Sequence, residues 1–277
     1  MLQQTPVLRV LPAWEEWLRR WPSPSALAAE SSGAAVRAWG RLGYPRRALR
    51  LHGAAVAIAT LHEGAVPASY QDLLSLPGVG SYTAAAVAAF AFGHRETVVD
   101  TNIRRVHARL VSGQALPAPA LTAAEQKLAA ELLPPDRQLA VEWSAGVMEL
   151  GALLCTARSP KCDACPVRNV CAWRAAGEPE PTYVPKGQAW AGTDRQVRGA
   201  VMAVLRAAQA PVPRSLFNGE APYASETVDG SPKGPVRSQL HRLHALRAGE
   251  LQLERAIDGL LHDGLAQTVD AGIQLPA

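Results

Sequence analysis

Four cysteines gather in one short stretch of the chain, at the spacing C-x6-C-x2-C-x5-C. They are Cys155, Cys162, Cys165 and Cys171. Because the sequence shows no export signal, four thiols so close together indicate a metal site rather than disulfide bonds. Zinc sites with four thiolates usually contain two C-x2-C pairs, whereas this stretch has one, and four thiolates are also the usual ligands of a [4Fe–4S] cluster. The pattern favours the cluster, with zinc or a metal-free group of thiols as alternatives.

A second pattern, Leu76-Pro77-Gly78-Val79-Gly80, separates two stretches of helical composition. Proline ends the first helix, and the two glycines allow a tight turn because they carry no Cβ. Backbone amides at the start of the next helix can then bind a phosphate group. An ordinary corner between two helices is the alternative. With the cysteines downstream, the pattern favours a helix-hairpin-helix that grips a DNA backbone without reading sequence. The residues expected to contact DNA there are Gly78, Val79, Gly80 and Ser81.

A third candidate for chemistry is Asp100, which follows Val98-Val99 and precedes a predicted helix over 101–111. Taken alone, Asp100 is best explained as the N-cap of that helix. The helix dipole would also keep its carboxylate ionised, and an ionised carboxylate can stabilise an oxocarbenium-like transition state on a sugar. The helix carries three arginines that either face phosphate groups or form a solvated helix face: Arg104, Arg105 and Arg109.

The elements that must position these residues are helices. Between residues 7 and 154 the chain is rich in Ala, Leu and Arg, lacks alternating strand patterns, and is interrupted by Pro or Gly. The predicted helices cover 7–20, 24–30, 32–40, 46–62, 69–75, 81–92, 101–111, 122–133 and 138–152. The sequence therefore predicts a mainly α fold.

The last hundred residues predict a small α+β domain of winged-helix type. A linker rich in Gly and Pro is followed by predicted helices over 195–208 and 253–263. Residues 264–275 predict a two-stranded hairpin that turns at Asp270-Ala271-Gly272, and 218–235 predict a loop. The expected domains are a helical barrel over 1–133, a cluster module over 134–175, a linker over 176–192 and the small domain over 193–277.

Composition limits the partners of the protein. The chain has 277 residues and a net charge of +4, and the whole excess lies in residues 1–173, which hold 17 basic and 13 acidic residues. This modest excess fits a nucleic-acid partner, although a solvated surface would explain it equally. No apolar run is long enough to span a bilayer, and Met1–Pro6 does not form a signal peptide. We therefore expect a cytoplasmic, nucleoid-associated monomer without a membrane partner.

The cysteine spacing, the hairpin and an aspartate twenty residues after Gly80 together resemble the [4Fe–4S] branch of the helix-hairpin-helix DNA glycosylases. The resemblance implies a helical barrel and a [4Fe–4S] cluster, mainly structural, that holds a basic loop against DNA. It also implies that Asp100 is the catalytic aspartate, followed in the family pattern by an asparagine, here Asn102.

Within this branch the sequence is most similar to the MutY-type adenine glycosylases. Tyr82 stands where the lyase-competent endonuclease III proteins have a nucleophilic lysine. Met1-Leu-Gln-Gln-Thr5 resembles the segment that enters the duplex around the oxidised guanine, which implies DNA contacts for Gln3, Gln4 and Thr5. Trp39-Gly-Arg-Leu-Gly-Tyr44 resembles the segment that wedges into the base stack, which implies roles for Leu42 and Tyr44, with Arg46 at the DNA. Arg41 stands where that pattern has a glycine, and Thr101 stands between Asp100 and Asn102 where glycine is usual.

The resemblance predicts excision of adenine opposite 8-oxoguanine or guanine in double-stranded DNA, by hydrolysis and without strand cleavage. Asp100, Tyr82 and Asn102 are the expected catalytic residues. In the family, a glutamate two residues before the segment that begins here at Met1 protonates the adenine. We therefore expect residues 1–277 alone to have impaired activity, and the first part of the cluster module to be missing. Two alternatives remain, a non-catalytic DNA-binding relative and an endonuclease III-like lyase.

The C-terminal part of the sequence does not resemble the NUDIX-like domain with which many MutY-type proteins check for 8-oxoguanine. Residues 192–198 and 253–275 resemble instead the short C-terminal region of actinobacterial MutY-type proteins. The sequence thus predicts a small domain with balanced charge, suited to packing as much as to DNA contact.

Overall fold

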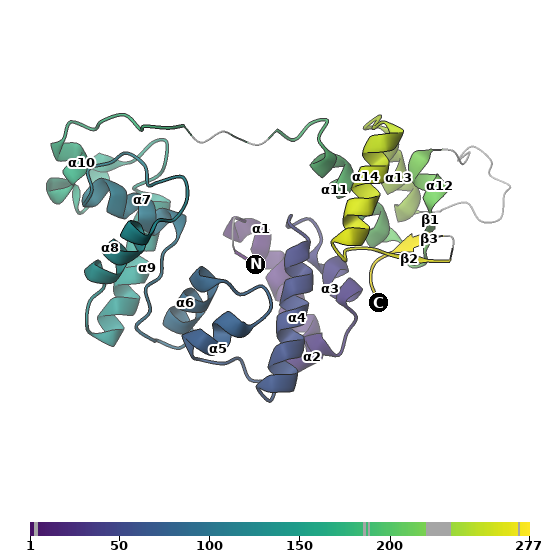
Figure 1. Ribbon diagram of the computed structural model, residues 1–277, viewed down its shortest axis with the longest axis horizontal. Coiled ribbons are helices and arrows are strands. Elements are labelled where there is room, and N and C mark those ends of the chain that lie inside the picture. Colours follow the sequence, from purple (N-terminus) through teal and green to yellow (C-terminus); the bar gives the residue numbers. More distant parts are fainter. Residues whose placement is uncertain (3–4, 185–186, 188, 220–233, 271) are drawn as a thin grey trace. The chain divides into compact units, whose positions relative to one another are not determined.

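The computed structural model describes residues 1–2, 5–184, 187, 189–219, 234–270 and 272–277 (Figure 1). Its contacts divide the chain into two compact units. The first unit joins Met1–Ala65 with Gln188–Ala277, and the second is Val66–Gly187. The expected domain boundaries, at 133/134, 175/176 and 192/193, follow a different division and stay a prediction.

The first unit begins with four helices. They are α1 (Val7–Arg20), α2 (Pro24–Ala28), α3 (Ser32–Trp39) and α4 (Arg46–Leu61). Ser23 and Ser31 are the N-caps of α2 and α3, and each side chain accepts a hydrogen bond from a first-turn amide. Three tryptophans pack edge to face in the core between these helices: Trp17, Trp21 and Trp39.

The C-terminal part of the same unit is a small α+β module. It contains α11 (Asp194–Ala207), β1 (Val212–Pro213), α12 (Arg214–Asn218), α13 (Pro235–His244), α14 (Glu250–His262), β2 (Gln267–Val269) and β3 (Gly272–Gln274). The strands form an antiparallel sheet in the order β1-β3-β2, with Thr268 opposite Ile273. The predicted hairpin is thus confirmed, and β1 adds a strand. The predicted turn includes Ala271, and the predicted loop over 218–235 includes 220–233, which lie outside the described residues.

One hydrophobic core joins both parts of this unit. Val36 and Trp39 of α3 belong to the same buried cluster as Val201 of α11, Ile257 of α14 and Ile273 of β3. About 25 cal/mol is gained for each Å² of apolar surface buried, so a shared core couples the stability of the parts that build it. The first helices and the last hundred residues therefore stabilise each other, although they are far apart in sequence.

The second unit holds the hairpin, Asp100 and the cysteines. Its helices are α5 (Tyr70–Ser75), α6 (Ser81–Phe90), α7 (Thr101–Leu110), α8 (Ala123–Leu132), α9 (Arg137–Leu153) and α10 (Ala172–Ala175), with 3-10 turns η1 (Cys162–Ala164) and η2 (Arg168–Val170). Ile103 and Val106 of α7, Val147 of α9 and Ala85 and Ala89 of α6 form the core. This packing fixes α7, which carries Asp100 at its start, against α9, which leads to the first cysteine.

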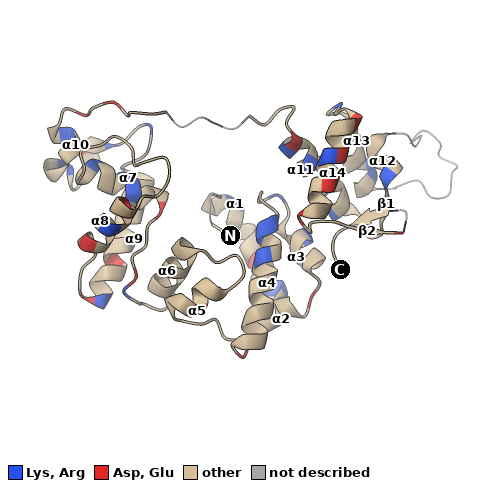
Figure 2. Cartoon of the chain, viewed as in Figure 1, with Lys and Arg blue, Asp and Glu red and all other residues tan. Residues whose placement is uncertain are grey.

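The predicted helices between residues 7 and 152 are all present, with ends within two residues of the expected ones. Basic residues mark the first part of α4, whereas α11 and α14 carry both signs of charge (Figure 2). Among the described residues, no helix combines the length and the apolar character needed to cross a membrane.

Candidate functional site

The hairpin between α5 and α6 has the predicted geometry. Gly78 has a φ of 77°, in the region that favours glycine, and the Val79 amide donates a 3.1 Å hydrogen bond to the Leu76 carbonyl. Gly80 is the N-cap of α6 and has no side chain to cap the first-turn amides. Those amides have no acceptor within the helix, and together with the helix dipole they suit an anion such as a phosphate.

Asp100 is the N-cap of α7, as expected from its local sequence. Its Oδ1 accepts a 2.7 Å hydrogen bond from the amide of Ile103. Its Oδ2 accepts a 2.9 Å hydrogen bond from Nδ2 of Asn102. The two hydrogen bonds therefore hold the carboxylate in one orientation at the positive end of the α7 dipole.

Tyr82 lies in the first turn of α6, close enough to Asp100 to sense its charge. Burial raises the pKa of the Tyr82 phenol, and the negative charge of Asp100 raises it further. The phenol therefore stays protonated at neutral pH and can donate a hydrogen bond. The structure thus brings together the three expected catalytic residues, Asp100, Asn102 and Tyr82, on the first turns of two neighbouring helices.

A chain of hydrogen bonds leads from Asp100 to the first cysteine. Asn102 Oδ1 accepts a 2.8 Å hydrogen bond from Nη2 of Arg105. The Arg105 guanidinium also donates to the carbonyl of Cys155 at 2.7 Å, from Nε, and to that of Gly151 at 2.6 Å, from Nη2. The planar guanidinium fixes several acceptors at once, so Arg105 aligns Asn102 with the end of α9.

Gly151 allows α7 and α9 to approach each other at this point. A Cβ placed on Gly151 would lie 2.7 Å from the Cβ of Asn102 and 2.8 Å from its carbonyl oxygen. Such distances are below van der Waals contact, so any larger residue would push Asn102 away. Gly151 was not predicted as a site residue. A glycine inside a long predicted helix was the signal that could have found it.

Arg109 forms a similar anchor one turn further along α7. Its Nη1 donates to Sγ of Cys155 at 3.4 Å and to the carbonyl of Thr156 at 2.8 Å, and its guanidinium lies 4.9 Å from the ring centre of Trp173. Arg105 is 7% exposed and Arg109 4%. The expectation that these two arginines face phosphate or solvent was therefore wrong, because backbone carbonyls far away in sequence surround them.

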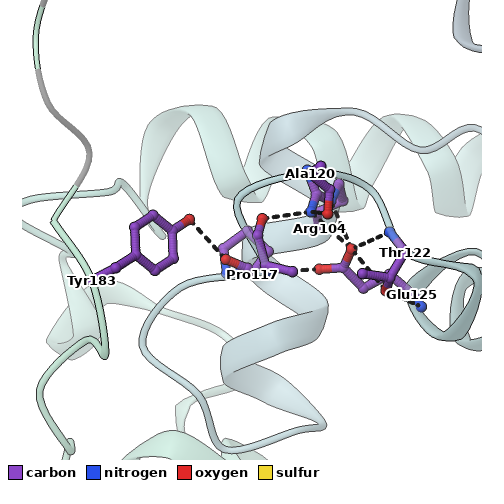
Figure 3. Close-up of polar contacts among 7 residues, drawn as sticks. Arg104, Pro117, Ala120, Thr122, Glu125 and Tyr183 are labelled. Carbon is purple, nitrogen blue, oxygen red and sulfur yellow. Dashed lines mark hydrogen bonds and ion pairs between the residues drawn. The ribbon is translucent and has the colours of Figure 1, made fainter.

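Arg104 has partners of its own. It pairs with Glu125 of α8 at 2.8 Å and donates to the carbonyls of Ala118 and Ala120 (Figure 3). Glu125 also accepts from the amide of Thr122, which forms a capping box at the start of α8. Burial raises the pKa of Glu125, but its hydrogen bonds with Thr122, Arg104 and Ala118 outweigh this and lower it below its usual value. Arg104 thus ties α7 to the loop before α8.

The four cysteines line one cavity. Cys155 follows α9, Cys162 is the first residue of η1, Cys165 follows η1, and Cys171 precedes α10. All four are free thiols of intermediate burial, and the same cavity is lined by Lys161, Arg168 and Trp173. Among the described residues, no three His, Cys, Asp or Glu side chains are arranged to hold a single metal ion. A cluster of four irons is larger than one ion, and four thiolates around a basic cavity fit an anionic cluster.

The two expected DNA-reading segments meet in the first unit. Thr5 Oγ1 donates to the carbonyl of Leu42 at 3.5 Å, and Arg9 Nη2 donates to that of Arg41 at 2.7 Å. Gln3 and Gln4 lie outside the described residues. Tyr44 is 52% exposed, whereas Leu42 is 6% exposed and packs in the core. Of the two residues expected to wedge into the base stack, Tyr44 is therefore the one open to a partner in this conformation.

Tyr44 and Arg46 stand at the end of a constrained loop. Gly43 has a φ of 82° and Tyr44 a φ of 46°, and the indole Nε1 of Trp39 donates a 2.8 Å hydrogen bond to the carbonyl of Gly43. A non-glycine residue in the left-handed region is strained, so its surroundings must hold it there. Arg46 lies 3.3 Å from a carboxylate oxygen of Asp263 and keeps a largely exposed side chain.

Sequence comparisons identify the kind of protein that shares these features. Residues 1–131 match the HhH-GPD superfamily of base excision DNA repair proteins, and residues 155–171 match the iron-sulfur binding domain of endonuclease III. The chain is 47% identical to an adenine DNA glycosylase of Mycobacterium tuberculosis, in an alignment that covers the whole chain and 83% of that relative. It is 37% identical to the human adenine DNA glycosylase over 65% of this chain and 33% of the human protein.

Two solved structures share the fold. A thermostable thymine-DNA glycosylase aligns with a TM-score of 0.56 and 27% identity, over 63% of this chain and 80% of that one. An endonuclease III trapped as a covalent intermediate on DNA aligns with a TM-score of 0.56 and 22% identity, over 64% and 82% of the two chains. At 22% identity, the match to endonuclease III shows a shared fold and nothing more.

Proposed function

The chain belongs to the adenine DNA glycosylase family, with an endonuclease III-type [4Fe–4S] motif, and from this premise we propose that it excises adenine opposite 8-oxoguanine or guanine. It would flip the adenine out of the duplex and hydrolyse its N-glycosidic bond, leaving an abasic site. The observation that carries the proposal is the Asp100 carboxylate, fixed by Asn102 and Ile103 at the start of α7.

In the proposed reaction, Asp100 faces the sugar as the bond to adenine breaks. Positive charge develops on the sugar in such a transition state, and a fixed carboxylate stabilises it without reorganising. Asn102 holds the carboxylate and is itself held by Arg105. The protonated Tyr82 donates a hydrogen bond that positions the base or the attacking water. Water, rather than an amine of the protein, is the proposed nucleophile, because Tyr82 stands where lyases have lysine.

The [4Fe–4S] cluster would be held by Cys155, Cys162, Cys165 and Cys171. When bound, it supplies a rigid anchor for the loop over 155–171. Lys161 and Arg168 lie in this loop and would be presented to the DNA backbone, where basic side chains contribute non-specific affinity. The Arg109 hydrogen bond to Sγ of Cys155 fixes the position of that sulfur.

The protein would hold its substrate at two kinds of contact. The hairpin, Gly78 to Ser81, would bind the phosphate backbone with its amides, without regard to sequence. The segment over 1–5 and the exposed Tyr44, with Arg46 next to its loop, would enter the duplex at the mispair, while Leu42 stays in the core. We propose that the protein acts as a monomer in the bacterial cytoplasm, close to the nucleoid.

Departure of adenine also needs a proton on the base. The family resemblance assigns this role to a glutamate two residues before the Met-Leu-Gln-Gln-Thr segment. General acid catalysis typically contributes about 10²–10⁴-fold to a rate. The test protein is therefore a chimera in which a family segment that carries this glutamate precedes Met1.

The experiment that tests the proposed function is single-turnover excision on duplexes with A opposite 8-oxoguanine, G or T. The chimera should release adenine from the first two and leave the third largely intact, and borohydride should trap no covalent complex. A trapped complex would favour a lyase instead. Tight binding to the mispair with no excision by the chimera would favour a non-catalytic relative. Either result would overturn the proposal.

A further inference from the structure

Two arginines fasten α3 to α11 by capping each other's helix. Arg37 of α3 donates through Nη1 to the carbonyls of Arg206 and Ala208, the latter at 2.8 Å. Arg206 of α11 donates through Nε to the carbonyl of Val36 at 3.1 Å. The last carbonyls of a helix receive no hydrogen bond from a backbone amide of the same helix. The helix dipole also favours a cation at that end. Each arginine therefore completes the C-terminal turn of the other helix.

A second contact joins the same module to α4. Asp263 follows α14 and lies 3.3 Å from Arg46, the first residue of α4, and 2.5 Å from Arg198 of α11. An acid at a helix C-terminus and a base at a helix N-terminus are both disfavoured by the dipole of their own helix. Pairing Asp263 with Arg46 offsets both penalties. The ion pair thus holds the start of α4 against the end of α14.

The loop that carries Tyr44 lies between these two attachments. It begins after Trp39, at the end of α3, and ends at Pro45, before α4. Gly40, Gly43 and Tyr44 all have positive φ. A short strained loop keeps its shape only while its two ends are held at a set separation. The module over 193–277 contacts both ends, through the Arg37 and Arg206 hydrogen bonds at the end of α3 and the Asp263–Arg46 ion pair at the start of α4.

The α3 surface is shaped to receive the C-terminal segment. A Cβ on Gly33 would lie 2.1 Å from the carbonyl oxygen of Pro276, so the segment crosses α3 where a side chain could not fit. Val36 and Trp39 of α3 share a core with Val201 and Leu205 of α11. The contact is thus close-packed as well as polar.

We infer that residues 193–277 form a clamp that sets the conformation of the loop 40–45 for entry into mispaired DNA, with Arg37 and Arg206 as positioning residues. This inference rests on the proposed function for the meaning of the loop. It assigns to the C-terminal module a part in mispair discrimination that needs no DNA contact of its own. The clamp acts through α3 on the strained Tyr44 and the Gly43 carbonyl.

Burying the charge of Arg206 costs desolvation free energy, so a gain in stability alone does not explain an arginine at this position. Its guanidinium is buried, and burial lowers its pKa to about 10, so it remains charged at neutral pH. Among the described residues, no carboxylate pairs with it, and its acceptor is the neutral carbonyl of Val36. Replacing a buried charge by an apolar side chain of similar volume is often neutral or stabilising. A methionine at this position should therefore leave the unit folded.

The test uses the full chain and the three buried indoles as reporters. The indole N–H of Trp39 donates to Gly43, whereas those of Trp17 and Trp21 are buried without a hydrogen-bond partner among the described residues. Their hydrogen exchange is measured by NMR in wild type, Arg206→Met, Arg206→Lys and Arg37→Met. The control is Arg214→Met, which removes the Arg214–Asp258 ion pair inside the C-terminal module. Trp39 reports on the loop, and the other two report on the core.

Arg206→Met and Arg37→Met should speed Trp39 exchange by about five- to tenfold, as expected for one lost hydrogen bond, while Trp17 and Trp21 change less than about twofold. Arg206→Lys keeps a donor and should restore part of the protection. Arg214→Met should match wild type. Equal acceleration of all three indoles, or Trp39 exchange no faster than in Arg214→Met, would overturn the clamp.

A binding measurement then separates this inference from the proposed function. Arg206→Met should lower the ratio of affinities for A:8-oxoguanine and A:T duplexes about tenfold, and leave A:T affinity unchanged because the hairpin is intact. An unchanged ratio with accelerated Trp39 exchange would overturn the discrimination role. If the wild-type protein does not bind the mispair more tightly than A:T, both the proposed function and the discrimination role are wrong. The indole exchange then still decides whether residues 193–277 hold the loop.

Discussion

Asn102 grips the carboxylate of Asp100 with a 2.9 Å hydrogen bond and is itself gripped by Arg105 at 2.8 Å. One side-chain amide thus uses its donor toward the reactive group and its acceptor toward the support. An amide reversed by 180° could satisfy neither partner, so the orientation of Asn102 is set. The geometry of Asp100 therefore depends on residues that never touch the substrate.

Asp100→Asn should abolish the charge while keeping the cap. Asparagine is as good an N-cap as aspartate, so the free energy of unfolding should change by less than about 1 kcal/mol. Loss of transition-state charge stabilisation should slow excision by roughly 10²–10³-fold or more. Single-turnover kinetics on the chimera and duplex binding of the same variant check this. Equal turnover by the variant would remove Asp100 from the mechanism.

Gly151→Ala should disturb the site from the neighbouring helix. The new methyl group would overlap Asn102, so we expect a loss of about 1–3 kcal/mol in the free energy of unfolding and slower excision. The matched control is Gly146→Ala on the same helix, where nothing lies within 4 Å of the new Cβ. That change should stabilise the protein by about 0.5–1 kcal/mol, because alanine favours helix over glycine. Identical kinetics in the two variants would contradict the role of close approach at Gly151.

Glu125→Gln should show, through the pH dependence of the free energy of unfolding, how much the Arg104–Glu125 ion pair stabilises the protein. At pH 7 the variant should be less stable by about 1–3 kcal/mol, because a partly buried guanidinium loses a charged acceptor. The folded pKa of Glu125 is lowered, so the unfolded chain takes up the proton first as the pH falls. The advantage of wild type should therefore be complete above about pH 4.5 and shrink below it. Chemical denaturation at several pH values measures this, and a constant difference down to pH 3 would contradict it.

His107 should make the fold sensitive to mild acid. It is buried, its Nε2 has no partner among the described residues, and burial lowers its pKa. The unfolded chain binds a proton near pH 6.5, which the folded chain accepts only at lower pH, so stability falls as the pH drops through about 6.5. His107→Phe should remove this part of the pH dependence. Parallel stability curves for wild type and variant between pH 5 and 8 would show that His107 does not titrate as described.

Cys165→Ser should lose the cluster. The variant should purify without the visible absorption of a [4Fe–4S] centre and with lower stability, because the loop over 155–171 then lacks its anchor. Arg168→Ala is the control, since it removes a basic side chain from the same loop and should keep the absorption while weakening DNA binding. Full absorption and normal iron content in Cys165→Ser would remove that residue from the ligand set.

Local features of this protein could be predicted from sequence because their causes are local. Asp100 caps a helix that starts at the next residue, and Gly78 supplies a turn that its neighbours require. The role of Arg105 could not be predicted this way, because its acceptors at Gly151 and Cys155 lie 46 and 50 residues further on. For the same reason, the burial of Leu42 became visible only with the core it shares with α11 and α14.

The first unit is built from the two ends of the chain, and this affects how the protein folds during synthesis. Residues 66–187 form a contiguous unit and can fold as soon as they leave the ribosome. The helices over 1–65, synthesised earlier, must wait for residues 188–277 to complete their core. Contacts between residues so distant in sequence form slowly, because the entropy of loop closure is lost before the contacts stabilise the fold. Residues 1–65 are thus expected to be among the last to become protected, and during that interval they are open to chaperones and proteases.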